Sequence, residues 1–410
     1  MVSVLLFIIY FFLLWKALFQ MRFVQTTELN RNTLFLLFCL KIAAGIALGW
    51  ISVQHSDQGN DYWTLHNYGL EETDLLKENP KEFITSLFYS PYQHFGKFFN
   101  STGSYWNDLK NNLIVKVLAL LNLISNKNYY VNSLFFNAFC FLGHVALFKL
   151  FYSYFPQKRN NIIIGAFLLP SMLYFSSGIH KDCIVFALMA FYSFSLTQII
   201  QRRTIRHPLI LIISSIGILL LRSHFFVALI PASIGLWLKI RYLVKHAFLK
   251  TYLISTILII TLTFFPATNP IKILSKKQAD FFELPQATSQ IPTDTLFPNL
   301  QSLIKNTPQA VVHAFAEPLP WRSPGSAVWF MGIEGWAYIL LFIYWLFFNK
   351  EKWKVHPLLF YSTLLAIPLF LFIGYIVPNV GSIERYRSII YPFLLLPMLC
   401  TIKHIKFKNI

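Results

Sequence analysis

The sequence has few charged residues, and acidic residues are the scarcer of the two signs. Only 13% of its 410 residues are Asp, Glu, Lys or Arg, and 17 acidic residues stand against 35 basic ones, giving a formal net charge of +18. Apolar residues make up 56% of the chain, and the mean hydropathy is +0.53. This composition is typical of an integral membrane protein.

Several signatures of soluble enzymes are missing. The sequence contains no P-loop, G-x-G-x-x-G, H-E-x-x-H or C-x-x-C motif, so nucleotide hydrolysis, dinucleotide redox chemistry and zinc proteolysis lack support. Its four cysteines are widely separated, which favours helix packing over a disulfide framework or a zinc site. We see no internal repeat, and this counts mildly against a secondary transporter built from two related halves. We therefore expect neither a metal nor a cofactor.

Apolar stretches of about twenty residues recur along the chain, and each is long enough to cross a bilayer core of about 30 Å. The first stretch lacks a basic start and a small-residue cleavage site, so we interpret it as a retained span. The predicted spans are 2–20, 34–53, 129–154, 161–178, 183–200, 207–222, 225–240, 251–267, 327–348, 357–377 and 388–403. The expected fold is a single all-α transmembrane domain over residues 1–410, with about eleven transmembrane helices.

Basic residues gather in the links on one side of these spans. They are Arg22, Arg31, Lys158, Arg159, Arg202, Arg203, Arg206, Lys239, Arg241, Lys245, Lys250, Lys350, Lys352, Lys354, Lys403, Lys406 and Lys408. The positive-inside rule makes that side cytoplasmic, which puts the N-terminus outside and the C-terminus inside. Anionic membrane lipid then explains the net charge, and no nucleic-acid partner is expected.

Two long segments fall on the opposite, outer side, at residues 54–128 and 268–326. Within the first, residues 111–130 are apolar for only about fourteen residues and include Lys116. If these residues formed a span, every later loop would change sides, and the basic links would then face outward against the positive-inside rule. We predict an interfacial or re-entrant helix there.

Three short outward turns carry compact polar clusters, in the stretches "GIHKD" (178–182), "RSH" (222–224) and "GSIERYR" (381–387). Arg, Lys and His suit a diphosphate, and a carboxylate can accept a proton from an attacking sugar hydroxyl. The predicted phosphate-binding residues are His180, Lys181, Arg222, His224, Arg322, Arg385 and Arg387. The predicted catalytic carboxylates are Asp61, Asp182 and Glu384. The matching substrate is a polyprenyl-phosphate-linked sugar, with a lipid tail for the helices.

Aromatic residues accompany polar ones in the two outer segments, in "DYWTLHNYGLEE" (61–72) and "EPLPWRSPG" (317–325). Such a mixture can stack a pyranose ring and hydrogen-bond its hydroxyls. Trp and Tyr also collect at membrane interfaces because they are amphipathic. Both interpretations stay open from the sequence.

Each candidate residue also has a purely structural explanation. Asp182 can cap the helix that comes after it, and Arg222 can snorkel to the interface. Glu384, Arg385 and Arg387 can form an ion-pair network that pins the last helix. Glu334, inside a predicted span, is either functional or hydrogen-bonded to a neighbouring helix.

An ordered set of short motifs carries a family resemblance: "GNDYW", "LPSMLYFSSGIHKD", "LLRSHFFVALI" and "ERYRSIIYPF". It resembles the EpsG-like and O-antigen-polymerase-like membrane proteins of bacterial exopolysaccharide assembly, and more distantly the GT-C membrane glycosyltransferases. The resemblance implies a location in the bacterial cytoplasmic membrane and a base at Asp61 or Asp57. It also implies that Arg222, Arg385 and Arg387 hold a lipid diphosphate.

This sequence departs from those families in two places. Asp57 and Asp61 are separated by "QGN", which breaks the paired acidic motif, and Ser223 stands where a proline is frequent. The choice between transferase and polymerase therefore stays open.

The expected function is sugar transfer or polymerisation from undecaprenyl-(di)phosphate-linked donors on the outer face of the membrane, by a glycosyltransferase or a polysaccharide polymerase. A transporter or flippase of lipid-linked oligosaccharide is the alternative. A non-catalytic scaffold that binds other glycan-assembly proteins is a third interpretation.

Overall fold

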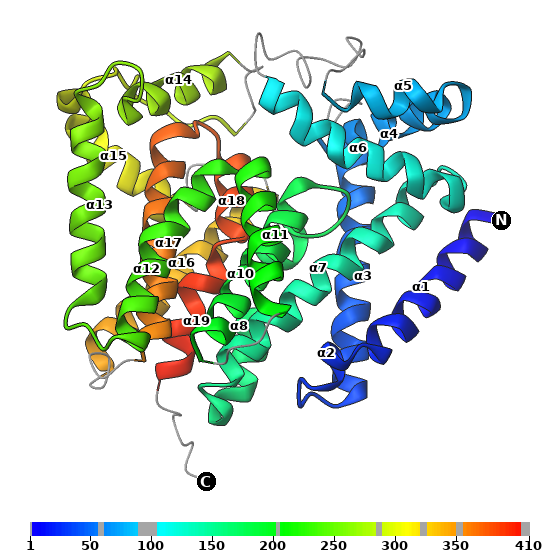
Figure 1. Ribbon diagram of the computed structural model, residues 1–410, viewed down its shortest axis with the longest axis horizontal. Helices are drawn as coiled ribbons and strands as arrows, with labels where there is room; N and C mark the ends of the chain where they lie inside the picture. The colour runs from blue at the N-terminus through cyan, green and yellow to red at the C-terminus, as the bar shows by residue number, and fades with distance from the viewer. Residues whose placement is uncertain are drawn as a thin grey trace. The chain divides into compact units, whose positions relative to one another are not determined.

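A computed structural model describes residues 2–55, 61–88, 105–201, 206–283, 289–319, 326–349 and 356–402. Within these residues the regular structure is helical, apart from one β-bridge between Gln290 and Asn379 (Figure 1). Contacts divide the chain into two compact units. The first takes in stretches 1–150, 173–195 and 205–223, and the second takes in 151–172, 196–204 and 224–410.

The first unit contains the N-terminal helices and a later helical pair. Its elements are α1 (Val2–Gln20), α2 (Arg22–Gln25), α3 (Arg31–His55), α4 (Asp61–Glu78), α5 (Pro80–Thr85), η1 (Ser86–Phe88), α6 (Tyr105–Ser125), α7 (Tyr129–Tyr152), most of α10 (Lys181–Gln201) and α11 (Arg206–Leu221).

The second unit contains most of the remaining helices, and α9 (Pro170–Phe175) lies at the boundary. Its elements are η3 (Pro156–Lys158), α8 (Arg159–Phe167), α12 (Ser223–Arg241), α13 (Ala247–Thr263), α14 (Pro270–Phe282), α15 (Leu300–Phe315), α16 (Ser326–Phe348), α17 (Pro357–Ile376), α18 (Val380–Ser388) and α19 (Tyr391–Thr401).

Seven helices of the described residues are long and apolar enough to cross a membrane: α1, α3, α7, α10, α12, α16 and α17. Helices α11, α13 and α19 are apolar but shorter. The predicted class, an all-α polytopic membrane protein, is confirmed.

Two predicted spans are wrong as continuous helices. Residues 161–178 divide into α8 and α9, because Pro170 has no N–H to continue the ladder and disfavours helical backbone at the residue before it. The predicted span 388–403 overlaps the end of α18, and its helix α19 begins only at Tyr391.

The two predicted outer loops contain helices of their own. The segment 54–128 includes α4, α5 and α6, and the helix predicted at 111–130 begins earlier, at Tyr105. The segment 268–326 includes α14 and α15, each preceded by an asparagine whose side chain accepts backbone N–H bonds. Asn269 and Asn299 are thus N-caps, and Pro270 starts α14 with the φ angle that a helix requires.

Helices α4 and α6 pack closely through polar side chains. Lys116 of α6 donates to the Glu72 carboxylate at 2.8 Å and to the Ser86 hydroxyl at 3.0 Å. Asn122 donates to the Gly69 carbonyl at 2.9 Å, and Asn132 of α7 donates to Asn122 at 2.6 Å. These bonds explain how the apolar α6 tolerates Lys116, because its charge is neutralised by α4.

Helices α7 and α10 form the buried centre of the first unit, where most of their residues are covered. They approach closely because Gly143 has no side chain: a Cβ there would lie 2.5 Å from the Ala187 Cα. Small residues at helix contacts are the usual route to tight packing in membranes.

Helix α17 is the centre of the second unit, and α14, α15 and α19 pack against it. The contact with α15 depends on Gly374, because a Cβ there would overlap the Ala310 carbonyl oxygen.

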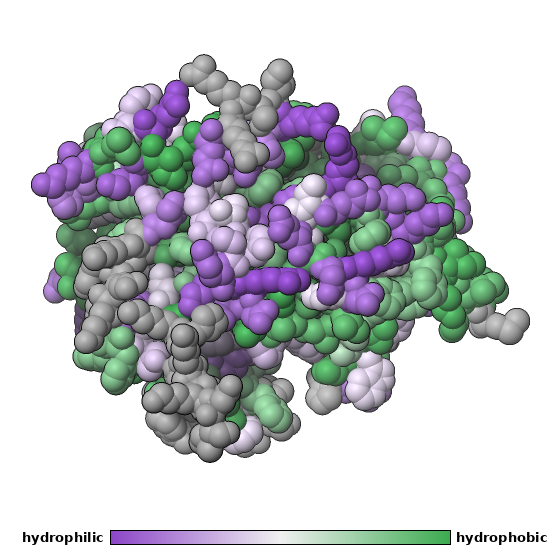
Figure 2. All heavy atoms as spheres, turned by 90° about the horizontal axis from the view of Figure 1, so that it is seen from below, coloured by the Kyte–Doolittle hydropathy of each residue, from purple (hydrophilic) through white to green (hydrophobic). Residues whose placement is uncertain are grey.

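Large apolar side chains are exposed along several helices, as lipid-facing surfaces require. Examples are Leu5 of α1, Ile254 of α13 and Phe347 of α16. Figure 2 shows apolar side chains, in green, beside hydrophilic ones, in purple, on one face of the molecule.

We expect Gly374→Ala to destabilise the second unit, because the added methyl meets the α15 backbone. The cost should be about 1–3 kcal/mol, as for overpacked cores. Gly335→Ala is the matched control, because a Cβ at Gly335 meets nothing nearer than the Tyr391 hydroxyl at 4.0 Å. Thermal unfolding in detergent measures both variants. An equal unfolding temperature for the two would contradict the packing described for α15 and α17.

Candidate functional site

The first unit buries an acid–arginine pair at the start of α10. Asp182 lies in the first turn of α10, and Arg222 comes directly after the end of α11. The Arg222 Nε donates to the Asp182 Oδ1 at 2.8 Å, and its Nη2 bonds the same oxygen. The Asp182 side chain is fully buried. Its pair with Arg222, forty residues later, joins the start of α10 to the end of α11.

His180 completes this cluster. Its Nδ1 lies 2.9 Å from the Asp182 Oδ2 and 3.2 Å from the Asp182 backbone N. A protonated Nδ1 donates to the carboxylate, whereas a bare Nδ1 accepts the N–H and caps α10; one nitrogen cannot do both. The shorter contact favours donation to Asp182. The Tyr62 ring of α4 lies 4.9 Å from the His180 ring and covers the cluster.

Lys41 lies well inside the predicted second span and is buried. Its Nζ donates to both the carbonyl and the hydroxyl of Ser176, each at 2.7 Å. Ser176 precedes His180 by four residues, so the only charge of α3 within its apolar part binds the same turn as the Asp182 cluster.

Aromatic residues of α4 pack against this end of the first unit. The Trp63 ring stacks on Tyr129 at 4.2 Å, and its Nε1 donates to the Gly49 carbonyl at 3.1 Å. The His66 ring lies 5.6 Å from Tyr129. The motif predicted to stack a sugar therefore uses Tyr62, Trp63 and His66 in packing contacts with the protein itself.

The second unit buries its own acid–arginine pair, within α18. The Arg387 Nη2 bonds the Glu384 carboxylate, and its Nη1 donates to the Ala314 carbonyl of α15 at 3.0 Å. Both side chains are fully covered. The Tyr391 hydroxyl, at the start of α19, donates to Glu384 at 3.4 Å. One arginine thus connects α15 with the turn between α18 and α19.

Glu334 of α16 joins a second polar group in the same unit. Its carboxylate accepts the Ser171 backbone N–H at 3.0 Å, the Ser171 hydroxyl at 3.0 Å and the Tyr338 hydroxyl. The Tyr338 ring lies 4.9 Å from the Tyr391 ring, which connects Glu334 with the Glu384 pair. Glu334 is thus hydrogen-bonded to Ser171 of a neighbouring helix, as the structural explanation predicted.

The remaining predicted residues lie in different settings. Lys181 begins α10 and is partly exposed. Arg385 is also partly exposed, with its guanidinium 5.1 Å from the Tyr386 ring centre. The His224 ring stacks on Phe372 at 4.2 Å in the second unit. Asp61 is the first residue of α4, but its side chain lies outside the part that the structure describes.

Arg322 and Asp57 lie outside the described residues altogether. Among the residues that are described, no group of three or more His, Cys, Asp or Glu is placed to hold a metal ion.

Sequence reasoning missed Tyr338 and Tyr391 as members of the second cluster. The spacing of Tyr338 carried a signal, because it comes four residues after Glu334 in the same helix, whereas Tyr391 and Arg387 belong to two different helices. Residues four apart lie on the same face of a helix. Ser171 and Ser176 had no such signal, since their partners are distant in the sequence.

Comparison with protein families, with curated proteins and with solved structures found no match.

We expect Asp182→Asn and Arg222→Gln each to destabilise the first unit by about 3–5 kcal/mol, because each leaves one buried charge without its partner. The double variant should cost less than the two single ones together. Thermal unfolding in detergent gives the comparison.

The exposed ion pair between Lys127 and Asp74, at 2.6 Å, is the control for that cycle. Lys127→Gln and Asp74→Asn should each change the stability by less than about 1 kcal/mol. Costs at Asp182 and Arg222 that are no larger than these would show that their pair does not fix the helix ends.

Burial lowers the pKa of His66 from 6.5 to about 4, against a smaller opposing effect of a backbone hydrogen bond to Lys127. Between pH 4 and pH 6.5, His66 therefore binds more protons in the unfolded chain than in the folded one. The stability should therefore fall on acidification from pH 7 to 4, by roughly 3 kcal/mol. Unfolding measured across this range should give a flatter profile for His66→Gln than for the parent. His246→Gln, at an exposed histidine, is the control; a parent-like profile for His66→Gln would refute this assignment.

Proposed function

We propose that this protein assembles cell-surface glycan on the outer face of the bacterial cytoplasmic membrane, taking sugars from undecaprenyl-(di)phosphate-linked donors. It acts as a glycosyltransferase or a polysaccharide polymerase related to the EpsG-like and O-antigen-polymerase-like proteins. The proposal includes about eleven spans, the seven long ones and four further apolar segments, with α6 as an interfacial or re-entrant helix.

The position of the buried pairs relative to the basic links supports the outer side. Asp182 and Arg222 lie at one end of the α10–α11 pair, and the link at the other end contains Arg202, Arg203 and Arg206. In the second unit, α18 lies between α17 and α19, and basic residues precede α17 and come after α19. The positive-inside rule then puts both pairs outside and the C-terminus inside.

The observation that carries the choice of an enzyme is the hydrogen bonding of Lys41 and Glu334, two charged residues deep inside predicted spans. A flippase needs charged groups at several depths of a cavity, whereas an enzyme concentrates them at one boundary. Lys41 binds the turn that contains the Asp182 cluster, and Glu334 binds Ser171 and Tyr338 next to the Glu384 cluster. Both deep charges are thus committed to hydrogen bonds near the boundary groups.

The structure suggests a division of roles among the predicted residues. Asp182 with Arg222, and Glu384 with Arg387, position helix ends. Lys181 in the first unit and Arg385 in the second are partly exposed, so each is available to a donor phosphate in this proposal.

In the transfer step, an acceptor hydroxyl attacks the anomeric carbon as the bond to the phosphate oxygen breaks. The lipid phosphate leaves with its electron pair, stabilised by the cations, and a carboxylate takes the hydroxyl proton. Asp61 is the candidate for that base in this proposal, because Asp182 and Glu384 are fully buried in their arginine pairs.

The test is deletion of the gene in its host, with mass spectrometry of lipid-linked saccharides after complementation. We expect Lys181→Ala and Arg385→Ala to reduce glycan at least tenfold while the protein still inserts. The charge-matched controls, Lys127→Ala and Lys305→Ala, should restore it, because both residues lie outside the two clusters.

The accumulating species decides between the activities. Single repeat units on the outer carrier lipid indicate a polymerase, and a carrier glycan that lacks one sugar indicates a transferase. Complete lipid-linked units that accumulate on the cytoplasmic side would contradict the enzyme and indicate a flippase.

A further inference from the structure

Helix α13 fixes the level of the membrane surface in the second unit. Its seventeen residues span about 25 Å, close to the thickness of the hydrocarbon core. Ile254, Ile257 and Leu258 are more than half exposed, as on a lipid-facing helix. Phe264 and Phe265, directly after the helix, are exposed too. If α13 crosses the bilayer, the chain beyond Phe265 lies at the level of the lipid headgroups.

Helix α14 begins there and lies across the end of α13 (Figure 1). Its exposed side carries Lys272, Lys276 and Lys277 together with the apolar Ile273, while Ile271 and Gln278 are buried. An amphipathic helix with lysines on its polar face is the usual form of a helix that lies in the membrane surface.

Residues 294–296 lie beside α14, and a groove runs between this segment and the helix. Gln278 holds this segment in place, because its side chain donates to the carbonyls of Asp294 and Tyr375 at 3.1 and 2.8 Å and accepts the Leu296 N–H at 2.7 Å. The groove between α14 and residues 295–296 has a volume of about 260 Å³.

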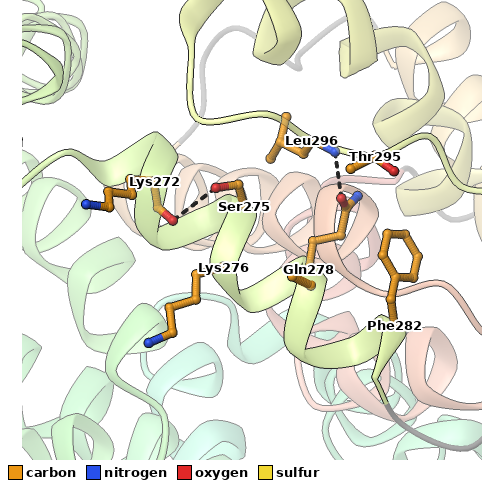
Figure 3. Close-up of a pocket in the computed structure, with 8 residues that line it drawn as sticks. Lys272, Ser275, Lys276, Gln278, Phe282, Thr295 and Leu296 are labelled. Atoms are coloured by element: carbon orange, nitrogen blue, oxygen red, sulfur yellow. Dashed lines mark hydrogen bonds between the residues drawn. The ribbon is translucent and has the colours of Figure 1, made fainter.

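The lining of the groove has basic and apolar members. Lys272 and Lys276 extend on the same side of α14, one turn apart, and Phe282 and Leu296 supply apolar walls (Figure 3). Two ammonium groups at this spacing can approach one phosphate together, and the apolar walls suit the adjoining glycerol or prenyl carbons.

We propose that this groove binds the phosphate of a membrane lipid. None of the residues that line the groove belongs to the clusters around Asp182 and Glu384, and the proposal does not depend on glycan assembly or on which leaflet α14 faces. Two lipids share the required chemistry, an anionic phospholipid and a polyprenyl phosphate.

Native mass spectrometry of the purified full chain tests the proposal. The protein is titrated with phosphatidylglycerol, with undecaprenyl phosphate and with zwitterionic phosphatidylcholine. The double variant Lys272→Gln/Lys276→Gln should bind at least one of the two anionic lipids about tenfold or more weakly. Lys277→Gln/Lys305→Gln removes the same charge at exposed positions off the groove and should bind as the parent does.

Ala279→Trp distinguishes binding in the groove from electrostatic attraction alone, because the added indole fills the groove and leaves the charge unchanged. It should lose binding as the lysine variant does, whereas Ile273→Trp, on an exposed part of α14 that does not line the groove, should not. Weaker binding of one anionic lipid alone would support the proposal and identify the source of the phosphate. Unchanged binding in Ala279→Trp, or equal binding of phosphatidylcholine, would overturn it.

Discussion

The cost of an unpaired charge away from water is the constraint on which this structure depends. Removing one ion from water costs several kcal/mol even after relaxation, unless a partner of opposite charge and further hydrogen bonds replace the solvent. The chain has few charged residues, yet it buries Asp182, Glu384 and Arg387 completely. Each of these residues is bonded to a partner, and the partners determine which helix ends meet.

Each pair connects elements that the chain alone would leave independent. Arg222 connects the end of α11 to the start of α10, and Arg387 connects α18 to the α15 backbone. Lys41 and Glu334 do the same for α3 and α16, through Ser176 and Ser171. Removing one partner leaves the other charge buried and unpaired, so each contact contributes to the stability of the helices that it joins.

The sequence was sufficient for the features that depend on composition and local pattern. Apolar runs predicted the helices of all seven long spans, and Asp182 in the first turn of α10 is a local signal. Helices α14 and α15 were missed although Asn269, Pro270 and Asn299 are recognisable start signals. The break at Pro170 was also readable, but the apolar residues on both sides suggested one continuous span.

The partners could not be predicted, because hydrogen bonds across long sequence separations leave no local pattern. Lys41 and Ser176 are 135 residues apart, and Ser171 and Glu334 are 163 apart. Similarly, "DYWTLHNYGLEE" fits a sugar platform or a packing surface equally well, and only the stacking of Trp63 on Tyr129 distinguishes them. Residue type limits the chemistry, whereas tertiary structure decides which groups are used for stability.

The claim that both buried pairs lie at the outer face is tested most directly by cysteine labelling in intact cells. Single cysteines are introduced at the exposed positions Asp74, Lys305 and Lys245, in a background without the four native cysteines. A membrane-impermeant maleimide should label positions 74 and 305 in intact cells, and position 245 only after permeabilisation. The reverse pattern would put the Asp182 and Glu384 clusters in the cytoplasm and contradict assembly of glycan on the outer face.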